Sequence, residues 1–148
     1  MTTAIEKAAE TVGIAAFVTD SENRLETQLN KLTRDIDDPI MLISWDINTN
    51  LNFDANGFLD NPLSNIVALL LAKAEDGTRD EQKSKSDEMG LLFQKFIKQL
   101  FDDLVLVQTT TNAPITGASY IAVPRYGSGV HSGILAKWTM KSAIVNCT

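Results

Sequence analysis

The side chains that could carry chemistry in this chain are few and lie far apart. His131 is the only histidine and Cys147 the only cysteine of the 148 residues. A nucleophilic thiol needs a positioned base, and a catalytic zinc ion needs three protein ligands, so neither set is available locally. We interpret His131 as a solvated loop residue and Cys147 as a small apolar side chain near a strand end. We therefore expect no enzyme, no catalytic residue and no cofactor.

Three other patterns only superficially resemble binding sites. The stretch "YGSGVHSG" (126–133) is rich in glycine, but it lacks the GxxxxGK[ST] spacing and lies between two expected strands, so it indicates a hairpin loop. Asp35, Asp37 and Asp38 lack the spacing of a calcium loop and are typical of an acidic turn that ends a helix. Asp102 and Asp103 could meet a cation of a partner, although solvated acids explain them equally well. We expect no metal site.

Composition limits the class of protein. With 44% hydrophobic and 22% charged residues, the chain is typical of one globular domain spanning residues 1–148. Its net charge of −6 and the absence of a Lys/Arg cluster argue against general nucleic-acid binding. The longest apolar stretch, residues 66–72, is far shorter than the roughly 20 residues that span a bilayer. The acidic N-terminus does not resemble a signal peptide, and a single cysteine fits a reducing cytoplasm.

Two helices are expected in the N-terminal part. Thr3 and Glu6 have the spacing of a capping box, and apolar residues follow on one helical face, so residues 1–18 are predicted to form a helical arm. The core is then expected over residues 20–146. Apolar residues at steps of four, three and four predict an amphipathic helix over 25–36, which Pro39 ends.

The middle of the chain predicts strands. Apolar residues alternate with polar ones from Met41 to Phe53, which indicates a long strand or a hairpin bent near residues 47–48. The segment "DANG" (54–57) is typical of a turn. Residues 65–73 are almost continuously apolar and predict a central strand covered on both faces.

The charged segment "EDGTRDEQKSKSDE" (75–88) holds six acids and three bases, so it is not a basic patch. Ser84 and Ser86 stand where helix caps are expected, and apolar residues then keep helical spacing through Leu104. We therefore interpret the segment as a solvated loop between a buried strand and a buried helix of the same core.

The C-terminal part alternates again. Residues 118–123 predict a short strand stopped by Pro124, and 134–145 predict a long last strand. The order of elements predicts an α+β fold, a mostly antiparallel sheet with helices packed on one face. The aromatic residues expected in its core are Trp45, Phe93, Phe96 and Trp138.

The order of elements resembles the tail terminator and tail-completion (head–tail joining) proteins of long-tailed bacteriophages. The stretches that carry the resemblance are "DDPIMLISW", "NIVALLLAK", "MGLLFQKFIKQLFDDL" and "SGILAKWTMKSAIV". Together they cover about residues 20–146 by pattern, without a diagnostic motif. The first eighteen residues and the 75–88 segment depart from that pattern.

The resemblance implies a structural virion protein, assembled in the host cytoplasm, that forms a ring at the tail end or head–tail junction. It would complete the tail and join it to the head as a cyclic homo-oligomer, a hexamer by the resemblance. Its partners would be tail-tube and neck or connector proteins. DNA would only pass through the lumen, without specific binding, and no membrane would be involved. A small non-enzymatic binding or accessory domain with a ligand cleft beside the sheet, and a tail-tube protein, are the alternatives.

Two surfaces are candidates for assembly. The last strand or the helix expected over 85–104 would meet the next subunit, and the strand's interface residues would be Leu135, Lys137, Thr139, Lys141 and Val145. The 75–88 segment would be either an ordinary exposed loop or a loop facing the lumen or the neighbouring ring. Its candidate residues are Asp76, Arg79, Asp80, Glu81 and Lys83.

Overall fold

The structure of the protein is a computed structural model. It describes residues 4–18, 39–43, 48–51, 53, 55–58, 63–73, 78–107, 114–126 and 131–141. This part contains two helices, α1 (Ala4–Thr11) and α3 (Arg79–Val107). It also contains six strands, which are β1 (Ala15–Val18), β2 (Ile40–Ile43), β3 (Asn48–Asn50), β4 (Leu63–Lys73), β5 (Ile115–Tyr126) and β6 (His131–Lys141). The helix expected over 25–36, Trp45 and the residues after 141 lie outside the described residues.

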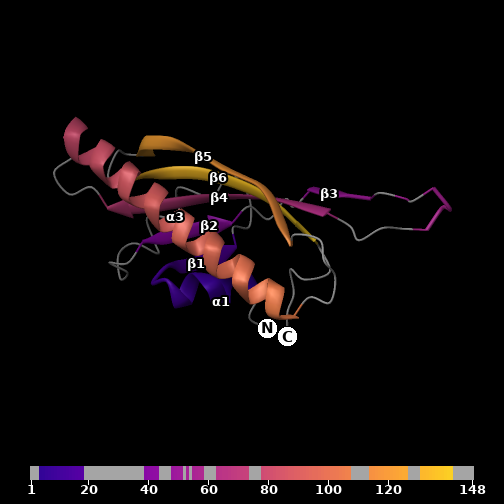
Figure 1. Cartoon of the computed structure of the whole chain (residues 1–148). Coiled ribbons are helices and arrows are strands. Elements are labelled where there is room, and N and C mark those ends of the chain that lie inside the picture. The colour runs from indigo at the N-terminus through magenta and orange to yellow at the C-terminus, as the bar shows by residue number, and fades with distance from the viewer. Residues whose placement is uncertain are drawn as a thin grey trace.

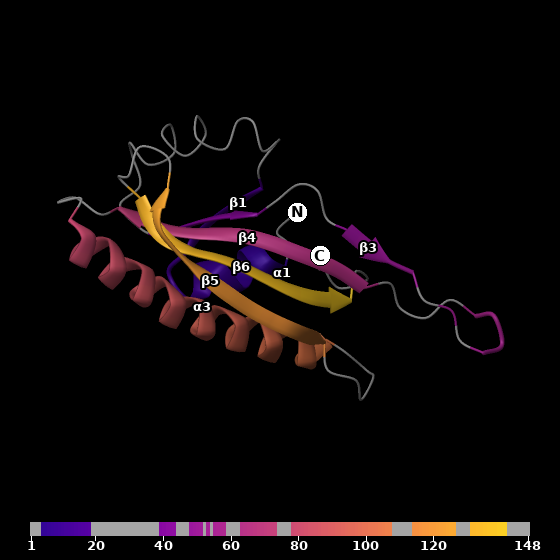
Figure 2. The same cartoon turned by 90° about the horizontal axis from the view of Figure 1, so that it is seen from above.

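The strands form one mixed sheet in the order β1-β2-β4-β6-β5, and β3 pairs with β4 on the edge that β2 also uses. Only the β1–β2 pair is parallel, and the other described pairs are antiparallel. Both described helices cover the same face of this sheet (Figures 1 and 2). The predicted α+β class, with a mostly antiparallel sheet and helices on one face, is confirmed.

The predicted helical arm over residues 1–18 is not found, since the described residues 4–18 form a helix and a strand that belong to the core. Helix α1 buries its apolar face in the main core, next to α3. The chain turns at Gly13, whose φ of 84° suits glycine, and the Ile14 amide donates to the Ala9 carbonyl over 2.8 Å. Residues 15–18 then add an edge strand to the sheet. The helical spacing of apolar residues therefore predicted the structure correctly only as far as Thr11.

An aromatic cluster fixes α3 on the sheet. Phe93 and Phe96 of the helix and Trp138 of β6 are buried, as predicted. The Trp138 ring centroid lies 5.8 Å from Phe93 and 5.6 Å from Phe96, distances typical of stabilising aromatic pairs. Tyr120 of β5 contacts Phe93 edge-on and lies over Gly90, where a Cβ would come within 2.9 Å of the tyrosine ring. The glycine thus lets β5 approach the helix closely.

The charged segment is largely helical, so the prediction of a loop over 75–88 is wrong for residues 79–88. Thr78 caps the helix, because its hydroxyl oxygen accepts a hydrogen bond from the Glu81 amide at 3.2 Å. Asp80 and Glu81 lie in the first turn, where the helix dipole favours acids. Ser86 lies inside the helix and is buried, so it is not a cap.

The last strand pairs along its whole length with β4, from Leu63 opposite Lys141 to Lys73 opposite His131. It begins three residues earlier than predicted. Gly133 is buried here, and a Cβ on it would lie 1.8 Å from the Leu70 carbonyl oxygen. Only glycine fits this position without displacing the backbone of β4.

Strand β5 does not stop at Pro124. The register with β6 shifts between Val123 and Tyr126, so that Pro124 falls within an irregularity of an edge strand, where a missing N–H costs no ladder hydrogen bond. A second shift lies between Thr116 and Ser119 and contains Gly117, whose φ is 64°. The strand is therefore twice as long as the predicted 118–123 segment.

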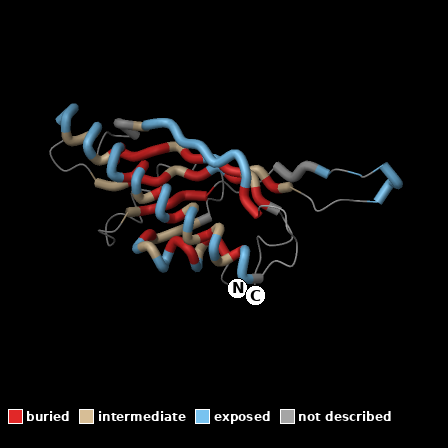
Figure 3. Tube along the Cα trace, viewed as in Figure 1, coloured by how far each residue is buried: buried red, intermediate tan, exposed pale blue. Residues whose placement is uncertain are grey.

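The faces of the central strand differ. The prediction that β4 is central is confirmed, because it pairs on both edges. Ile66, Ala68 and Leu70 lie in the core with α1 and α3. Val67 on the opposite face is exposed and Leu69 only half-buried, so the strand is not fully covered on both sides (Figure 3). The predicted long strand or hairpin over 41–53 is found as two separate strands, β2 and β3, that both pair with β4.

Candidate interaction surface

The outward side chains of β6 lie where the alternation predicted them. Even-numbered residues from Ile134 to Met140 are buried in the core. Leu135 and Thr139 are half-buried and Lys137 is exposed on the face of the sheet turned away from α1 and α3. The side chain of Lys141 and the whole of Val145 lie outside the described residues. We call this side of the sheet the outward face.

An apolar row crosses the outward face. The strand registers place Leu42, Leu69, Leu135 and Ile121 opposite one another across β2, β4, β6 and β5. Leu42 is buried in a small second cluster, whereas Ile121 has 64% of its surface exposed. Val67, two residues from Leu69 on the same face, is 39% exposed. The row is therefore uncovered toward β5, and contiguous exposed apolar surface of this kind is typical of interaction sites.

A hollow lies beside this row. It has a volume of about 470 Å³, and its lining includes Asn65, Val67, Gly117, Lys137 and Thr139. The bulge at Gly117 opens it, because two residues of β5 stand there opposite one residue of β6. Thr139 donates a hydrogen bond to the Asn65 side-chain oxygen over 2.9 Å, which fixes the polar wall. The hollow thus combines apolar, neutral polar and cationic groups.

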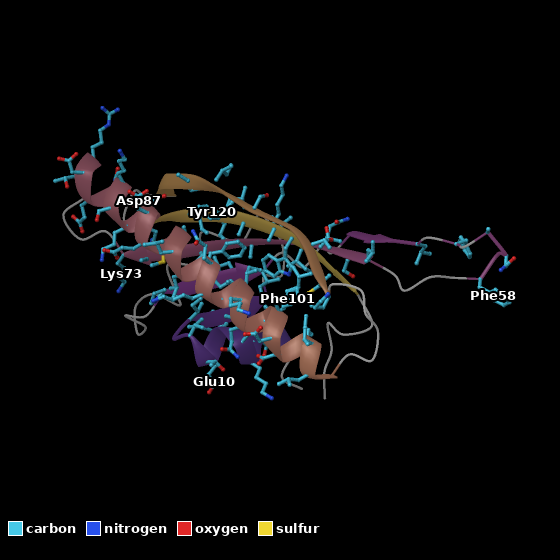
Figure 4. All side chains as sticks on the ribbon, in the orientation of Figure 1. Glu10, Phe58, Lys73, Asp87, Phe101 and Tyr120 are labelled. Carbon is cyan, nitrogen blue, oxygen red and sulfur yellow. The ribbon has the colours of Figure 1, made fainter. Side chains whose placement is uncertain are left out.

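A projecting arm carries a second apolar surface. Beyond the pairing of β3 with the start of β4, the described residues 51, 53 and 55–58 extend away from the body of the molecule (Figure 1). Leu51, Phe53 and Phe58 expose 59%, 66% and 70% of their surfaces, and Phe58 lies at the far end (Figure 4). The sequence analysis missed this surface, because the alternating pattern of 41–53 was assigned to one core face. The "DANG" turn was the available signal that a hairpin tip follows.

The residues predicted to line a lumen or to meet the next ring lie on the first turns of α3. Arg79, Asp80 and Lys83 are exposed and Glu81 is half-buried, and Asp76 lies outside the described residues. The described ones share one helical end, at the opposite end of the molecule from the arm (Figure 1). A cleft of about 500 Å³ lies beside them, and its lining includes Lys73, Glu81, Lys85 and Glu88. This end of the protein is therefore polar and of mixed charge.

His131 is not a solvated loop residue. It is the first residue of β6, only 4% exposed, and pairs with Lys73 across the ladder. Its Nε2 atom is buried without a hydrogen-bond partner in the part of the chain that is described. Burial, and secondarily the charge of Lys73, lowers the pKa of His131 below its ordinary value of 6.5. The neutral imidazole is therefore favoured in the folded protein.

The described residues bring no catalytic set together. They include no group of three His, Cys, Asp or Glu side chains that could hold a metal ion. Asp102 accepts a hydrogen bond from Lys98 and Asp103 accepts one from Gln99, each at 2.8 Å, so both acids are bonded within α3. Neither described helix combines the length and apolar character needed to cross a membrane.

Comparisons with known proteins give no relative. No protein-family model, no curated protein and no solved structure matches the chain.

Proposed function

We propose that the chain is a structural subunit that assembles with copies of itself into a ring at the tail end or head–tail junction of a long-tailed bacteriophage. There it completes the tail and joins it to the head, with tail-tube and neck or connector proteins as partners. The phage assignment rests on the order of elements, from the helix-covered sheet to the long last strand. The virion is the implied location.

The observation that carries self-assembly is the presence of two exposed apolar surfaces on different parts of one subunit. The outward face exposes Val67 and Ile121, and the arm exposes Leu51, Phe53 and Phe58. Two different surfaces on each copy support head-to-tail contacts, which close into a ring when the rotation between neighbours allows it. The net charge of −6 agrees with the passage of DNA through a ring, because a negatively charged protein does not retain a polyanion.

The mixed-charge start of α3 is a candidate surface toward the lumen or the neighbouring ring. It is a helical end rather than the loop expected from sequence. The side chain of Leu91 on the same helix is exposed, and it supports the other assignment, in which α3 meets the next subunit. Both assignments are part of the proposal.

The test is the mass of the wild-type protein by light scattering, with negative-stain images, alone and with tail tubes. A closed ring of several 16.2 kDa subunits, six by the resemblance, is the expected result. Open filaments would indicate the tail-tube alternative. A protein that stays monomeric at all concentrations, even with viral partners, would overturn the ring. The 470 Å³ hollow, a volume within the range of about 300–1,000 Å³ of ligand sites, would then favour an accessory binding domain.

A further inference from the structure

We propose that the arm of one copy docks on the outward face of the next copy, with the apolar side chains of the arm covering Val67, Leu135 and Ile121 beside the hollow at Gly117. This inference rests on the proposed self-assembly and names the surfaces that make it. The ligand of the outward face is therefore a second copy of this chain.

The arm leaves its largest apolar side chains exposed. Phe53 and Phe58 each expose about two thirds of their surfaces, at 66% and 70%. From Asn50, the last residue of β3, to Asn56 the chain advances six residues, which at about 3.3 Å per residue carries the tip up to roughly 20 Å from β3. Large aromatic side chains presented this way are typical anchors of protein interfaces.

The arm does not lie on its own outward face. Asn48, Thr49 and Asn50 pair with Asn65, Ser64 and Leu63, so the base of the arm continues the sheet in the direction of its strands. The arm therefore leads away from the body of the sheet (Figures 1 and 2), where β4 carries Val67 and β5 carries Ile121. Within one copy, Phe58 at the tip of the arm therefore does not cover these side chains (Figure 4). The contact is therefore made between copies.

Charge favours the outward face as the surface that receives the arm. Residues 48–62 contain Asp54 and Asp60 and no basic residue. Lys137 is an exposed basic residue of the outward face, although the whole chain has a net charge of −6. The two acidic residues of this segment are therefore attracted to Lys137 on this face. The hollow beside Lys137, at about 470 Å³, offers room for an aromatic ring.

The experiment uses three double variants of the full chain. The arm variant is Phe53→Asp/Phe58→Asp, and the face variant is Ile121→Asp/Lys137→Glu. The control is Val105→Asp/Leu106→Asp, which places the same charges on exposed apolar positions of α3 beyond the 85–104 stretch considered for the interface. Circular dichroism and thermal melts confirm folding, and sedimentation measures mass.

Head-to-tail docking predicts a specific pattern. The arm and face variants each raise the concentration for half-assembly at least about 30-fold, as loss of an interface anchor does. The control assembles as the wild type does. An equimolar mixture of arm and face variants forms dimers and nothing larger, because one intact arm then meets one intact face.

Other patterns overturn the inference. A ring formed by either variant alone contradicts docking of the arm on the outward face, and so does a mixture that stays monomeric. If the wild type still forms a ring in these cases, the proposed function is retained. Failure of the control alone assigns the interface to α3 instead. A wild type that never assembles overturns both proposals.

A second measurement does not depend on weakened assembly. In a Cys147→Ser background, Phe58→Cys and Ile121→Cys are placed in separate chains, mixed, and treated with oxidised glutathione. The expected product is a disulfide-linked heterodimer, formed at least about 10-fold faster than with Leu106→Cys in place of Ile121→Cys. Equal rates for the two pairs contradict the proposed docking.

Discussion

The hydroxyl of Ser86 donates a hydrogen bond to the carbonyl oxygen of Gly133 over 2.5 Å, and this contact joins α3 to β6. Both residues are buried. At the same point a Cβ on Gly133 would overlap the carbonyl of Leu70. Helix α3 and strands β4 and β6 are therefore packed closely at this point, with no room for a side chain on residue 133.

Replacing Ser86 with alanine should lower the free energy of unfolding by about 1–2 kcal/mol, because a buried carbonyl loses a hydrogen-bond donor. Urea denaturation measures the change. Ser84→Ala is the matched control, since Ser84 is exposed on the same helix and should change stability by less than about 0.5 kcal/mol. Equal effects of the two substitutions would show that the Ser86 contact does not stabilise the fold.

Gly133→Ala should destabilise the protein strongly, by about 3 kcal/mol or more, because the added methyl group forces β4 and β6 apart. Gly117→Ala is the comparison. Its Cβ would meet nothing within 4 Å, but its φ of 64° is strained for alanine, so a loss of about 1–2 kcal/mol is expected. Thermal melts of both variants rank the two effects, and a milder loss for Gly133→Ala would contradict the packing.

Trp138→Ala should cost about 3–5 kcal/mol of unfolding free energy, because it empties the space beneath Phe93 and Phe96. Trp138→Phe keeps an aromatic ring there and should cost clearly less. Chemical denaturation followed by far-ultraviolet circular dichroism measures both. Unchanged stability in the alanine variant would mean that the inward register of β6 is wrong.

Stability should fall as pH is lowered below about 6.5, partly through His131. Its pKa in the folded protein is below the ordinary value, so the unfolded chain takes up a proton first as the pH falls. The loss is at most about 1.4 kcal/mol per pH unit and ends once the pH is below the folded-state pKa. His131→Phe should remove this part of the dependence. Urea titrations at about pH 7.5 and pH 5 test it, and parallel curves for variant and wild type would refute it.

The sequence predicted those elements in which the spacing of apolar residues follows a single buried face. Even residues of β6 and the apolar run of β4 indicated their strands, and the class followed from their order. Prediction of the charged segment was wrong because Ser84 and Ser86 looked like caps, whereas the cap is Thr78. Glu, Gln and Lys are good helix formers, so their polarity alone does not indicate a loop.

The rest depended on tertiary pairing. His131 follows two glycines and looks solvated, and its burial arises from pairing with Lys73, which is 58 positions earlier in the chain. Pro124 indicated the end of a strand, but an edge position and a register shift accommodate it. The outward candidates Leu135, Lys137 and Thr139 were placed correctly by parity. The arm was missed because a projecting hairpin and a core strand share the same alternation.

The pairing of β4 with β6 also determines when this protein can complete its fold during synthesis. Fifty-eight positions separate Lys73 from its ladder partner His131. A ribosome adding about 5–20 residues per second needs roughly 3–12 s to bridge that interval. Throughout it, one long edge of a strongly apolar strand has no partner, so the nascent chain is most exposed to misassociation before β6 emerges.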